Sequence, residues 1–418
     1  MVQYMSGSEG VPLRLVGGMP ESDMDDLSFL SNRGIICLST IDWDFLWQRQ
    51  QELMTRLADA GVPVLYVEPL GIRSARLSDV SKIARRVRRW LNQGLHTFTR
   101  LAPNLYRLSP FALPFQGHAS VDAINRWLVV DAVRHAGKSI SLTQPVLWTF
   151  YATRVVLDVI AALDPALVLY DCIDDVTHNP KGVARDYPKT ERALLSRADL
   201  VLTTSSSLYV DKRPFNQNTH FIPPGANIEQ FATPAAEAPA LAGLPHPRLL
   251  FFGGIDERVD LQMLATLARR RREWTLILVG VIRTDITPLL GLPNVFFAGQ
   301  QSHHDLPAYV QHADILLVPY LVNEYTRHIY PAKIFECLAT GKPILATPLP
   351  DLLPLAGPVR ILAPDEDPVL VVENMLAEDT PLQEQERRAI ARQNSWDARL
   401  QDIQSLLRQA LAAKNTPT

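Results

Sequence analysis

The sequence of 418 residues has few cysteines, no long hydrophobic run and no strong excess of charge. Its three cysteines, Cys37, Cys172 and Cys337, lie in apolar segments without metal-ligand spacing, which favours buried, reduced thiols over a disulfide scaffold or a zinc site. No apolar run reaches the roughly 18 residues of a membrane span, and the aspartate-containing N-terminus is not expected to be a signal peptide. A net charge of −3 excludes a general nucleic-acid binder. These absences predict a cytoplasmic protein.

Short apolar runs alternate with segments of helical periodicity in both halves of the chain. In the first half these runs occupy residues 34–39, 62–67, 145–150, 167–172 and 200–205. In the second half they read RLLFFGG, TLILVG, NVFFAG, ILLVPY and PILAT. Such alternation predicts the α/β class, with parallel, doubly wound sheets. We therefore expect two Rossmann-like domains that face each other across a ligand cleft.

The expected division of the chain follows from changes in composition. It consists of a loose leader at 1–32, an N-terminal domain at 33–228, a Pro/Ala-rich linker at 229–247, a C-terminal domain at 248–382, and a C-terminal helix and tail at 383–418. The last helical stretch, roughly 383–411, is amphipathic and has no strand after it. We expect it to pack back on the first domain.

The segment IYPAKIFECLATGKPILAT, from residue 329 to residue 347, predicts a site for a phosphate and a sugar. Pro331 suits the first position of a helix, whose amide groups and positive dipole end attract an anion. Lys333 adds a full charge, and Glu336, three residues further on the same face, can accept hydrogen bonds from ribose hydroxyls. Either residue alone fits an ordinary ion pair on a helix surface. Their combination favours a site for a nucleotide diphosphate.

Two glycines support this interpretation from the start of the second domain. Gly253 and Gly254 lie between an apolar strand and a helix, where the lack of side chains lets backbone amides approach a phosphate. Arg258 is expected at the start of that helix, where it would meet the diphosphate and, with Lys333, neutralise the charge of a leaving group. A solvated helix residue is the alternative for Arg258.

Carboxylates follow two predicted strands of the first domain. Asp44, in the sequence STIDWDFLWQRQQ, is a candidate for acceptor recognition, or it caps a helix that begins near Phe45. Asp174 is the better candidate for a catalytic carboxylate on the acceptor side. His118 is a candidate acid or base beside the cleft, although a histidine in a loop is commonly just solvated. DWD has the form of a metal-binding motif, but that motif is found in a different fold, and we predict no metal.

The segment from residue 79 to residue 100 has the composition of a helix at a membrane surface. Apolar residues recur in it at helical spacing, and basic residues surround them. The residues predicted to dock on anionic lipid are Arg85, Arg86, Arg88, Arg89 and Trp90. The alternative is a helix that packs on its own domain and exposes a basic face.

The order of the motifs resembles that of the GT-B glycosyltransferases, and in particular glycosyltransferase family 4 and its branch that makes surface polysaccharides such as teichuronic acids. The motifs are YDCIDD at 170–175, ADLVLTTSSSL at 198–208, IPPGANIEQF at 222–231, FFGGIDERVDL at 251–261, ADILLVPY at 313–320 and PAKIFECLATGKPIL at 331–345. The resemblance covers about residues 33 to 347. It implies a retaining transfer from a nucleotide-sugar that is bound by the C-terminal domain.

One position departs from the family pattern. The family commonly carries two glutamates with seven residues between them, and His328 stands where the first would precede Glu336. The polysaccharide branch tends to replace that glutamate by an Asn/Thr loop. The resemblance therefore implies that Asn323 and Thr326 contact the transferred sugar, whereas Glu324 has no assigned role.

Together these patterns predict a peripheral membrane enzyme on the inner face of the plasma membrane. It would move a sugar from a nucleotide-diphosphate donor to a lipid-linked or polysaccharide acceptor, without metal, other cofactor or nucleic acid. Two alternatives are a sugar-nucleotide 2-epimerase of the same architecture and a catalytically silent scaffold of a polysaccharide assembly complex. The epimerase would require an acid/base set at the sugar ring, and the scaffold would bind partners without hydrolysing a donor.

Overall fold

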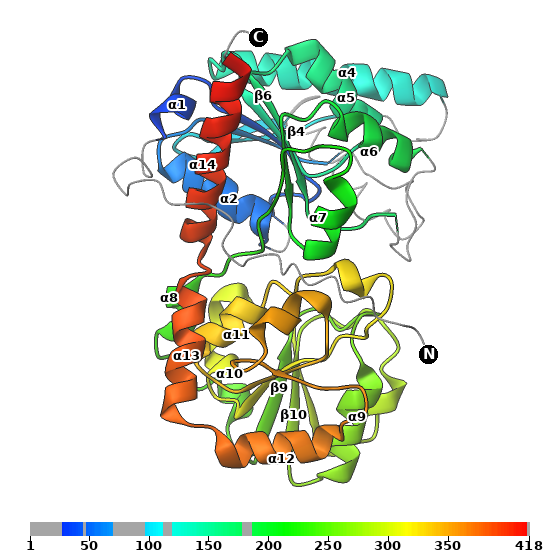
Figure 1. Ribbon diagram of the computed structural model, residues 1–418, viewed down its shortest axis with the longest axis vertical. Helices are drawn as coiled ribbons and strands as arrows, with labels where there is room; N and C mark the ends of the chain where they lie inside the picture. The colour runs from blue at the N-terminus through cyan, green and yellow to red at the C-terminus, as the bar shows by residue number, and fades with distance from the viewer. Residues whose placement is uncertain (1–26, 45–46, 70–96, 112–118, 178–185, 416–418) are drawn as a thin grey trace.

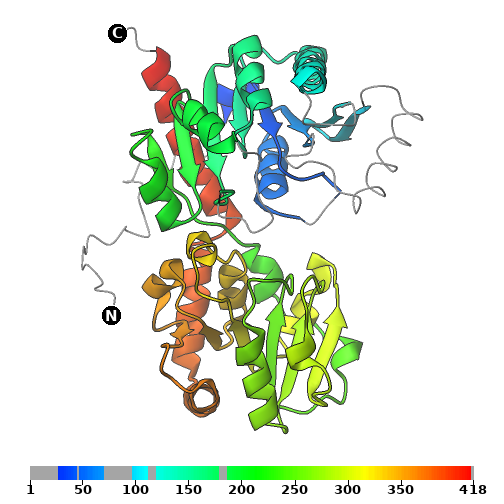
Figure 2. The same cartoon turned by 90° about the vertical axis from the view of Figure 1, so that its right-hand side faces the viewer.

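Two sheets, one in each half of the chain, form the framework of the protein (Figure 1). A computed structural model describes residues 27–44, 47–69, 97–111, 119–177 and 186–415. Each sheet is covered by helices, and the two α/β domains are stacked along the long axis of the molecule, as a second view confirms (Figure 2). The predicted α/β fold with two Rossmann-like domains is confirmed.

The first sheet has the strand order β3-β4-β2-β1-β5-β6-β7-β8, and every neighbouring pair is parallel except β3 and β4. Its strands are β1 Ile35–Leu38, β2 Val64–Val67, β3 Thr97–Ala102, β4 Leu105–Ser109, β5 Val146–Thr149, β6 Leu167–Cys172, β7 Leu200–Thr203 and β8 Thr219–Phe221. The central strands are buried along their whole length. Helices cover both faces of a parallel sheet, which explains the continuous apolar runs in the sequence.

The helices of this domain divide between the two faces of the sheet. They are α1 Ser28–Ser31, α2 Arg49–Asp59, α4 Ala119–Ser139, α5 Arg154–Leu163, α6 Tyr187–Leu195 and α7 Ser206–Lys212. Leu53 and Leu57 of α2 belong to the core on one face, whereas Val133 of α4 and Val159 of α5 belong to the core on the other. This two-sided cover is the doubly wound arrangement expected for alternating strands and helices.

The last residues of one expected helix form a strand instead. The basic segment was predicted to be helical as far as residue 100, but its last residues form β3, which pairs antiparallel with β4. Phe98 lies opposite Leu108, and its ring stacks on Tyr106 at a centroid distance of 5.7 Å. These cross-strand contacts outweigh the helical spacing at this end of the segment.

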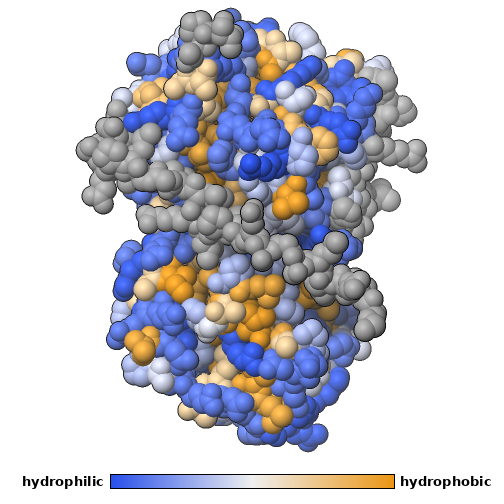
Figure 3. Space-filling view, in the orientation of Figure 1, coloured by the Kyte–Doolittle hydropathy of each residue, from blue (hydrophilic) through white to orange (hydrophobic). Residues whose placement is uncertain are grey.

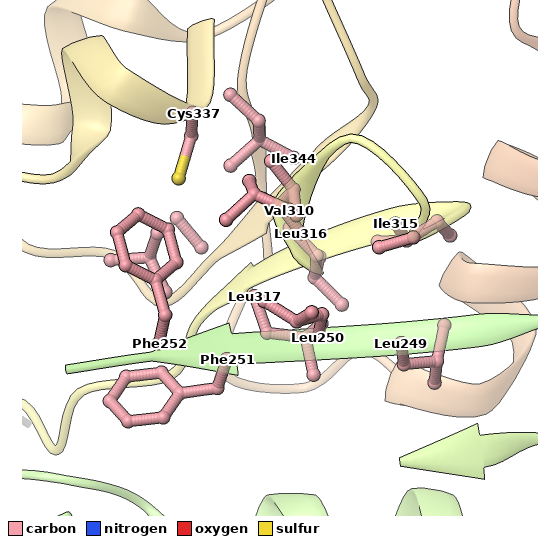
Figure 4. Close-up of a cluster of buried hydrophobic side chains, with 14 of the residues drawn as sticks. Leu249, Leu250, Phe251, Phe252, Val310, Ile315, Leu316, Leu317, Cys337 and Ile344 are labelled. Atoms are coloured by element: carbon pink, nitrogen blue, oxygen red, sulfur yellow. The ribbon is translucent and has the colours of Figure 1, made fainter. Parts of the chain in front are cut away.

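The second sheet is wholly parallel, with the order β11-β10-β9-β12-β13-β14. Its strands are β9 Arg248–Phe252, β10 Thr275–Val279, β11 Val295–Gly299, β12 Ile315–Val318, β13 Ile344–Ala346 and β14 Arg360–Ile361. The accompanying helices are α8 Ile228–Ala232, α9 Leu261–Arg270, α10 Pro307–Val310, α11 Ile334–Thr340, α12 Pro368–Glu378 and α13 Pro381–Arg392. Figure 4 shows how residues of the central strands β9 and β12 pack with Val310, Cys337 and Ile344. This core fixes the end of β9, from which the candidate site is built.

The C-terminal helical stretch is two helices, not the single one that the sequence predicted. α13 packs on α11 and α8 in the second domain, and α14, Trp396–Asn415, packs on α2, β6 and β7 in the first (Figure 1). The break comes where the chain crosses between domains, since Ala226 accepts a hydrogen bond from the Trp396 amide (3.2 Å) and donates one to the Asn394 carbonyl (3.1 Å). The prediction that the C-terminal helix packs back on the first domain is confirmed for α14.

The carboxyl edges of the two sheets face each other. Ser206, after β7, donates from its backbone amide to Asp351 Oδ1 of the second domain at 3.0 Å. Ser207 Oγ donates to the Arg327 carbonyl at 3.2 Å. In parallel α/β sheets ligands commonly bind at the carboxyl edge, and the two domains meet at this edge.

On the face shown in Figure 3, hydrophobic residues form separate patches among hydrophilic ones. None of the described helices is long and apolar enough to cross a membrane.

Candidate functional site

Lys333 lies over the glycine that follows β9. Its ammonium group donates a hydrogen bond to the Phe252 carbonyl and lies 4.0 Å from the centre of the Phe251 ring. Gly253 has φ = +123°, a conformation that side chains rarely adopt, and a Cβ built on it would overlap the Lys333 amine. Glycine is therefore required at position 253 for both its conformation and the space it leaves. The lysine charge is held at the carboxyl end of β9.

Arg258 is held by Asp256, a partner that sequence reasoning missed. Arg258 Nε donates to Asp256 Oδ1 at 2.8 Å, and Nη2 donates to Oδ2 at 2.6 Å. Asp256 is only 5% exposed, and its hydrogen bond raises the pKa of the arginine despite partial burial. The spacing Asp-x-Arg in the sequence was the available signal. This bidentate contact with the carboxylate fixes the plane of the guanidinium group.

The predicted position of Arg258 at the start of a helix is wrong. α9 begins at Leu261, and Asp260 caps it by accepting a hydrogen bond from the Met263 amide at 2.9 Å. Arg258 instead lies in the preceding turn. A Cβ on Gly254 would lie 3.3 Å from Asp256 Oδ2, so the second glycine leaves room for the carboxylate that orients the arginine.

Tyr320 lies near both cations. Lys333 Nζ is 5.4 Å and Arg258 Cζ 6.0 Å from the centre of its ring. Tyr320 follows β12, the neighbour of β9, and is 6% exposed. The aromatic ring stabilises both charges at short range, so the two cations share one edge of the sheet. Two fixed positive charges at one edge of a sheet can neutralise a polyanion such as a diphosphate.

Glu336 is bonded to a histidine from a distant part of the chain. His303 Nε2 lies 2.9 Å from Glu336 Oε1, and the exposed fractions of the two side chains are 33% and 16%. Burial lowers the pKa of His303, but the hydrogen bond and charge of Glu336 raise it by more, so the net shift is upward. The sequence offered no signal for His303, which the strand β11 and the turn η5, His303–Asp305, bring to this place.

Pro331 does not occupy the first helical position that was predicted for it. α11 begins at Ile334, and Pro331 precedes the turn that leads into it, accepting a hydrogen bond from the Ile334 amide at 3.0 Å. The helix has only seven residues, so its dipole is small. The positive charge of the site therefore comes chiefly from Lys333 and Arg258.

Asn323 and Thr326 hold their own loop together. Asn323 Oδ1 accepts hydrogen bonds from the Tyr325 and Thr326 amides, both at 3.0 Å. Thr326 is fully buried, and its hydroxyl donates to the Leu321 carbonyl at 2.5 Å. The contact of these two residues with a sugar stays a prediction, and the structure adds a scaffolding role for both. Glu324 is exposed and pairs with Arg327 at 3.1 Å.

His328, at the position of the family's first glutamate, lies against the other domain. It is 5% exposed, with Nε2 3.5 Å from Asp175 Oδ2 and Nδ1 3.8 Å from Asp211 Oδ2. The neighbouring Asp174 is exposed and lies near Tyr325, whose pKa is raised by burial and then by the charge of Asp174. Carboxylates of the first domain thus reach the loop that precedes Lys333.

Asp44 does not cap the following helix. α2 begins at Arg49, and its cap is Gln48, whose amide donates to Gln51 Oε1 at 3.0 Å in a capping box. Asp44 instead pairs with Arg107 of β4 at 2.8 Å, so the capping alternative is wrong. Within the ranges that the structure describes, no group of three or more His, Cys, Asp or Glu is arranged to hold a metal ion.

Several predicted residues lie outside the described residues. They are the first 26 residues of the leader, His118, and the membrane-docking residues Arg85, Arg86, Arg88, Arg89 and Trp90.

Comparison with known proteins defines the class. Residues 246–377 match the family model described as Glycosyl transferases group 1. The fold is similar to that of sucrose-phosphate synthase from Thermosynechococcus elongatus (TM-score 0.66, 19% identity, 91% of this chain and 100% of that one). It is also similar to Anabaena Alr3699/HepE in complex with UDP and glucose (TM-score 0.63, 15% identity, 90% and 99%). The chain has the GT-B glycosyltransferase fold, and its second domain is a glycosyltransferase group 1 domain.

A curated relative is closer in sequence. The chain is 30% identical over 259 residues to TuaH of Bacillus subtilis strain 168, a provisionally named teichuronic acid biosynthesis glycosyltransferase. The match covers 56% of this chain and 65% of TuaH, which is slightly less than two thirds of that relative. The resemblance to the teichuronic acid branch of the GT-B glycosyltransferases is thereby confirmed.

Proposed function

We propose that the protein is a glycosyltransferase that moves a sugar, with retention, from a nucleotide-diphosphate donor to a lipid-linked or polysaccharide acceptor. The observation that carries this proposal is the pair of cations, Lys333 and Arg258, that both lie within 6.0 Å of the centre of the Tyr320 ring at the carboxyl edge of the second sheet. The group 1 glycosyltransferase domain contains all three residues. A diphosphate is the leaving group that this charge arrangement suits.

The donor would be bound by residues of the second domain only. Lys333 and Arg258 neutralise the negative charge that develops on the diphosphate as the sugar departs. Gly253 leaves the space in which the Lys333 amine lies at the end of β9. Glu336 accepts hydrogen bonds from the ribose hydroxyls, because a carboxylate can accept from two neighbouring hydroxyls at once.

The acceptor would be bound by the first domain. Asp174, which lies near Tyr325 of the second domain, would orient or deprotonate an acceptor hydroxyl. Asp44, His118 and the basic segment with Trp90 complete the acceptor side of the proposal. The name of TuaH supports a polysaccharide product. An acceptor anchored in lipid would account for a basic amphipathic segment that docks on the inner face of the membrane.

The decisive experiment is incubation of the purified protein with a panel of UDP-, GDP- and dTDP-sugars. Release of the nucleoside diphosphate, dependent on added acceptor, supports the proposal, and NMR of the product reports retention or inversion at the anomeric carbon. A donor at 100 times its dissociation constant should add about 2.7 kcal/mol of stability, which a melting curve detects. Formation of an epimer would instead support the 2-epimerase. Absence of binding and turnover across the panel would remove the assignment as a transferase.

A further inference from the structure

We propose that His303 is a positioning residue for donor recognition, which holds Glu336 in the orientation that a nucleoside ribose requires. The inference rests on the proposed function, because it assigns a role to the contact between His303 and the carboxylate that would bind ribose. It adds a residue that is 33 positions away in sequence and belongs to a different element.

His303 is itself held from two other sides. Its backbone carbonyl accepts a hydrogen bond from Gln230 Nε2 at 2.6 Å. The ring of Phe231, which is fully buried, lies 5.5 Å away at an interplanar angle of 69°, an edge-to-face contact. The imidazole is therefore held on η5 by two contacts with α8, the first helix after the domain crossing, and it presents Nε2 to Glu336.

The contact also restricts Glu336. A glutamate side chain loses on the order of 1.5 to 2 kcal/mol of rotamer freedom when it is ordered completely. His303 orders it before any ligand is bound, so that the ligand does not bear the whole of this cost. Since Oε1 is bonded to His303, Oε2 is the oxygen assigned to the ribose. The bond with His303 thus selects one of the two carboxylate oxygens for recognition.

The charges that face His303 favour this bond. Glu336 of α11 and Glu52 of α2 both raise the pKa of His303, against the opposing effect of burial. Glu52 is paired with Arg56 on its own helix, whereas Glu336 lies in direct contact with the imidazole. A protonated imidazole makes a charge-assisted bond, which is stronger than a neutral one. The carboxylate that the donor would need is therefore held by a charge-assisted bond when His303 is protonated.

Two substitutions separate the hydrogen bond from the packing. His303→Phe keeps a ring against Phe231 and removes the donor to Glu336, whereas His303→Gln keeps a donor and removes the ring. His304→Gln is the matched control, because His304 is on the same turn, is 94% exposed and contacts Asp305 instead. The dissociation constants of UDP, GDP and dTDP are measured by calorimetry for all three variants and for Glu336→Gln, with KM and kcat for the active donor.

We expect His303→Phe to weaken binding of the preferred nucleoside diphosphate about tenfold, to raise KM by a similar factor and to leave kcat within about twofold. His303→Gln should recover part of the affinity, and His304→Gln should bind like the wild type. A melting curve of each variant checks the fold. If His303→Phe is unfolded, a normal affinity in His303→Gln supports the role of the donor, and a tenfold loss there overturns it.

Other outcomes distinguish this inference from the proposed function. If Glu336→Gln weakens binding while folded His303→Phe binds like the wild type, the positioning role is overturned and the proposed function stands. If His303→Phe keeps its affinity and only His303→Gln loses it, the ring packing is what matters, and the inference is again overturned. If the wild-type protein binds none of the three nucleotides, the proposed function itself fails.

Discussion

Arg258 and Asp256 form a bidentate ion pair within one turn, with hydrogen bonds of 2.8 Å from Nε and 2.6 Å from Nη2. The guanidinium group is therefore oriented before an anion arrives, and it does not have to be ordered by the ligand. Lys333 has a corresponding anchor in the Phe252 carbonyl. The proposed diphosphate site is thus built from cations whose positions are fixed by the protein.

The first prediction concerns these two cations. Lys333→Ala and Arg258→Ala should each lower turnover by at least about tenfold, because each removes charge stabilisation of the leaving group that is worth a few kcal/mol. Steady-state kinetics with the active donor measure the effect, and Arg269→Ala, an exposed change on α9, is the control. Wild-type turnover in both variants would remove the diphosphate assignment.

The second prediction concerns Gly253. Gly253→Ala should lower activity by more than about tenfold, because the added Cβ displaces the Lys333 amine from its place. Gly291→Ala is a matched control, since Gly291 also has a positive φ (+75°) but no atom within 4 Å of the added Cβ. Both variants should lose about 1 to 2 kcal/mol of stability from backbone strain, Gly253→Ala should lose more because of the overlap, and only Gly253→Ala should lose activity. Equal activities in the two variants would contradict the steric argument.

The third prediction concerns metal. Activity should persist in EDTA, because Lys333 and Arg258 supply positive charge at the place where a divalent cation would otherwise act on the diphosphate. Initial rates are compared with and without chelator, and then after addition of Mg²⁺ or Mn²⁺. Loss of activity that manganese or magnesium restores would return the DWD sequence to consideration as a ligand site.

The fourth prediction concerns pH. The pKa of His303 is raised above 6.5 in the folded protein, so its protonated form stabilises the fold. This contribution is fully present below the pKa of the unfolded chain and is lost as the pH rises through the higher folded pKa. The ring is partly exposed, so the effect should be small, below about 1 kcal/mol, and should shift the melting temperature by no more than about 2 °C. The melting temperatures of wild type and His303→Phe should converge as the pH rises above 6.5. A gap that widens with pH would contradict the sign.

The fifth prediction concerns the basic segment. Replacing Arg85, Arg86, Arg88 and Arg89 with glutamine should abolish sedimentation with anionic vesicles and leave donor hydrolysis intact, because it removes only the charges that attract acidic lipids. Wild-type binding should weaken as salt shortens the Debye length below about 8 Å. A control removes four exposed arginines elsewhere, at Arg197, Arg269, Arg272 and Arg392. Equal sedimentation of the two variants would show that position on the surface does not matter.

Much of the fold was predictable because strands that are buried on both faces of a parallel sheet produce continuous apolar runs in the sequence. All ten apolar runs contain a strand of the two sheets. The ends of helices were predicted less well, because they depend on hydrogen bonds that the apolar pattern does not show. α2 begins at Arg49 and not near Phe45, because Gln48 and Gln51 bond each other reciprocally. The C-terminal stretch breaks because its backbone bonds Ala226, more than 160 residues earlier.

The candidate site was predictable only as far as it is local. Lys333 and Glu336 share a short segment, so their proximity followed from spacing alone. Asp256 was missed because the turn conformation, and not a regular period, brings it to Arg258. His303 reaches Glu336 through the order of parallel strands, which the sequence does not encode in any short pattern.

The two backbone crossings between the domains run side by side, with Ala226 bonded to both Asn394 and Trp396. A Cβ on Gly225 would lie 2.9 Å from Trp396 atoms, so the crossings are also in close contact. Because the two connecting segments are adjacent, we expect relative motion of the domains to be a bend about the line on which these segments lie. We expect separation of the domains to be resisted by both segments. A protease cut in one crossing would leave the domains joined by the other.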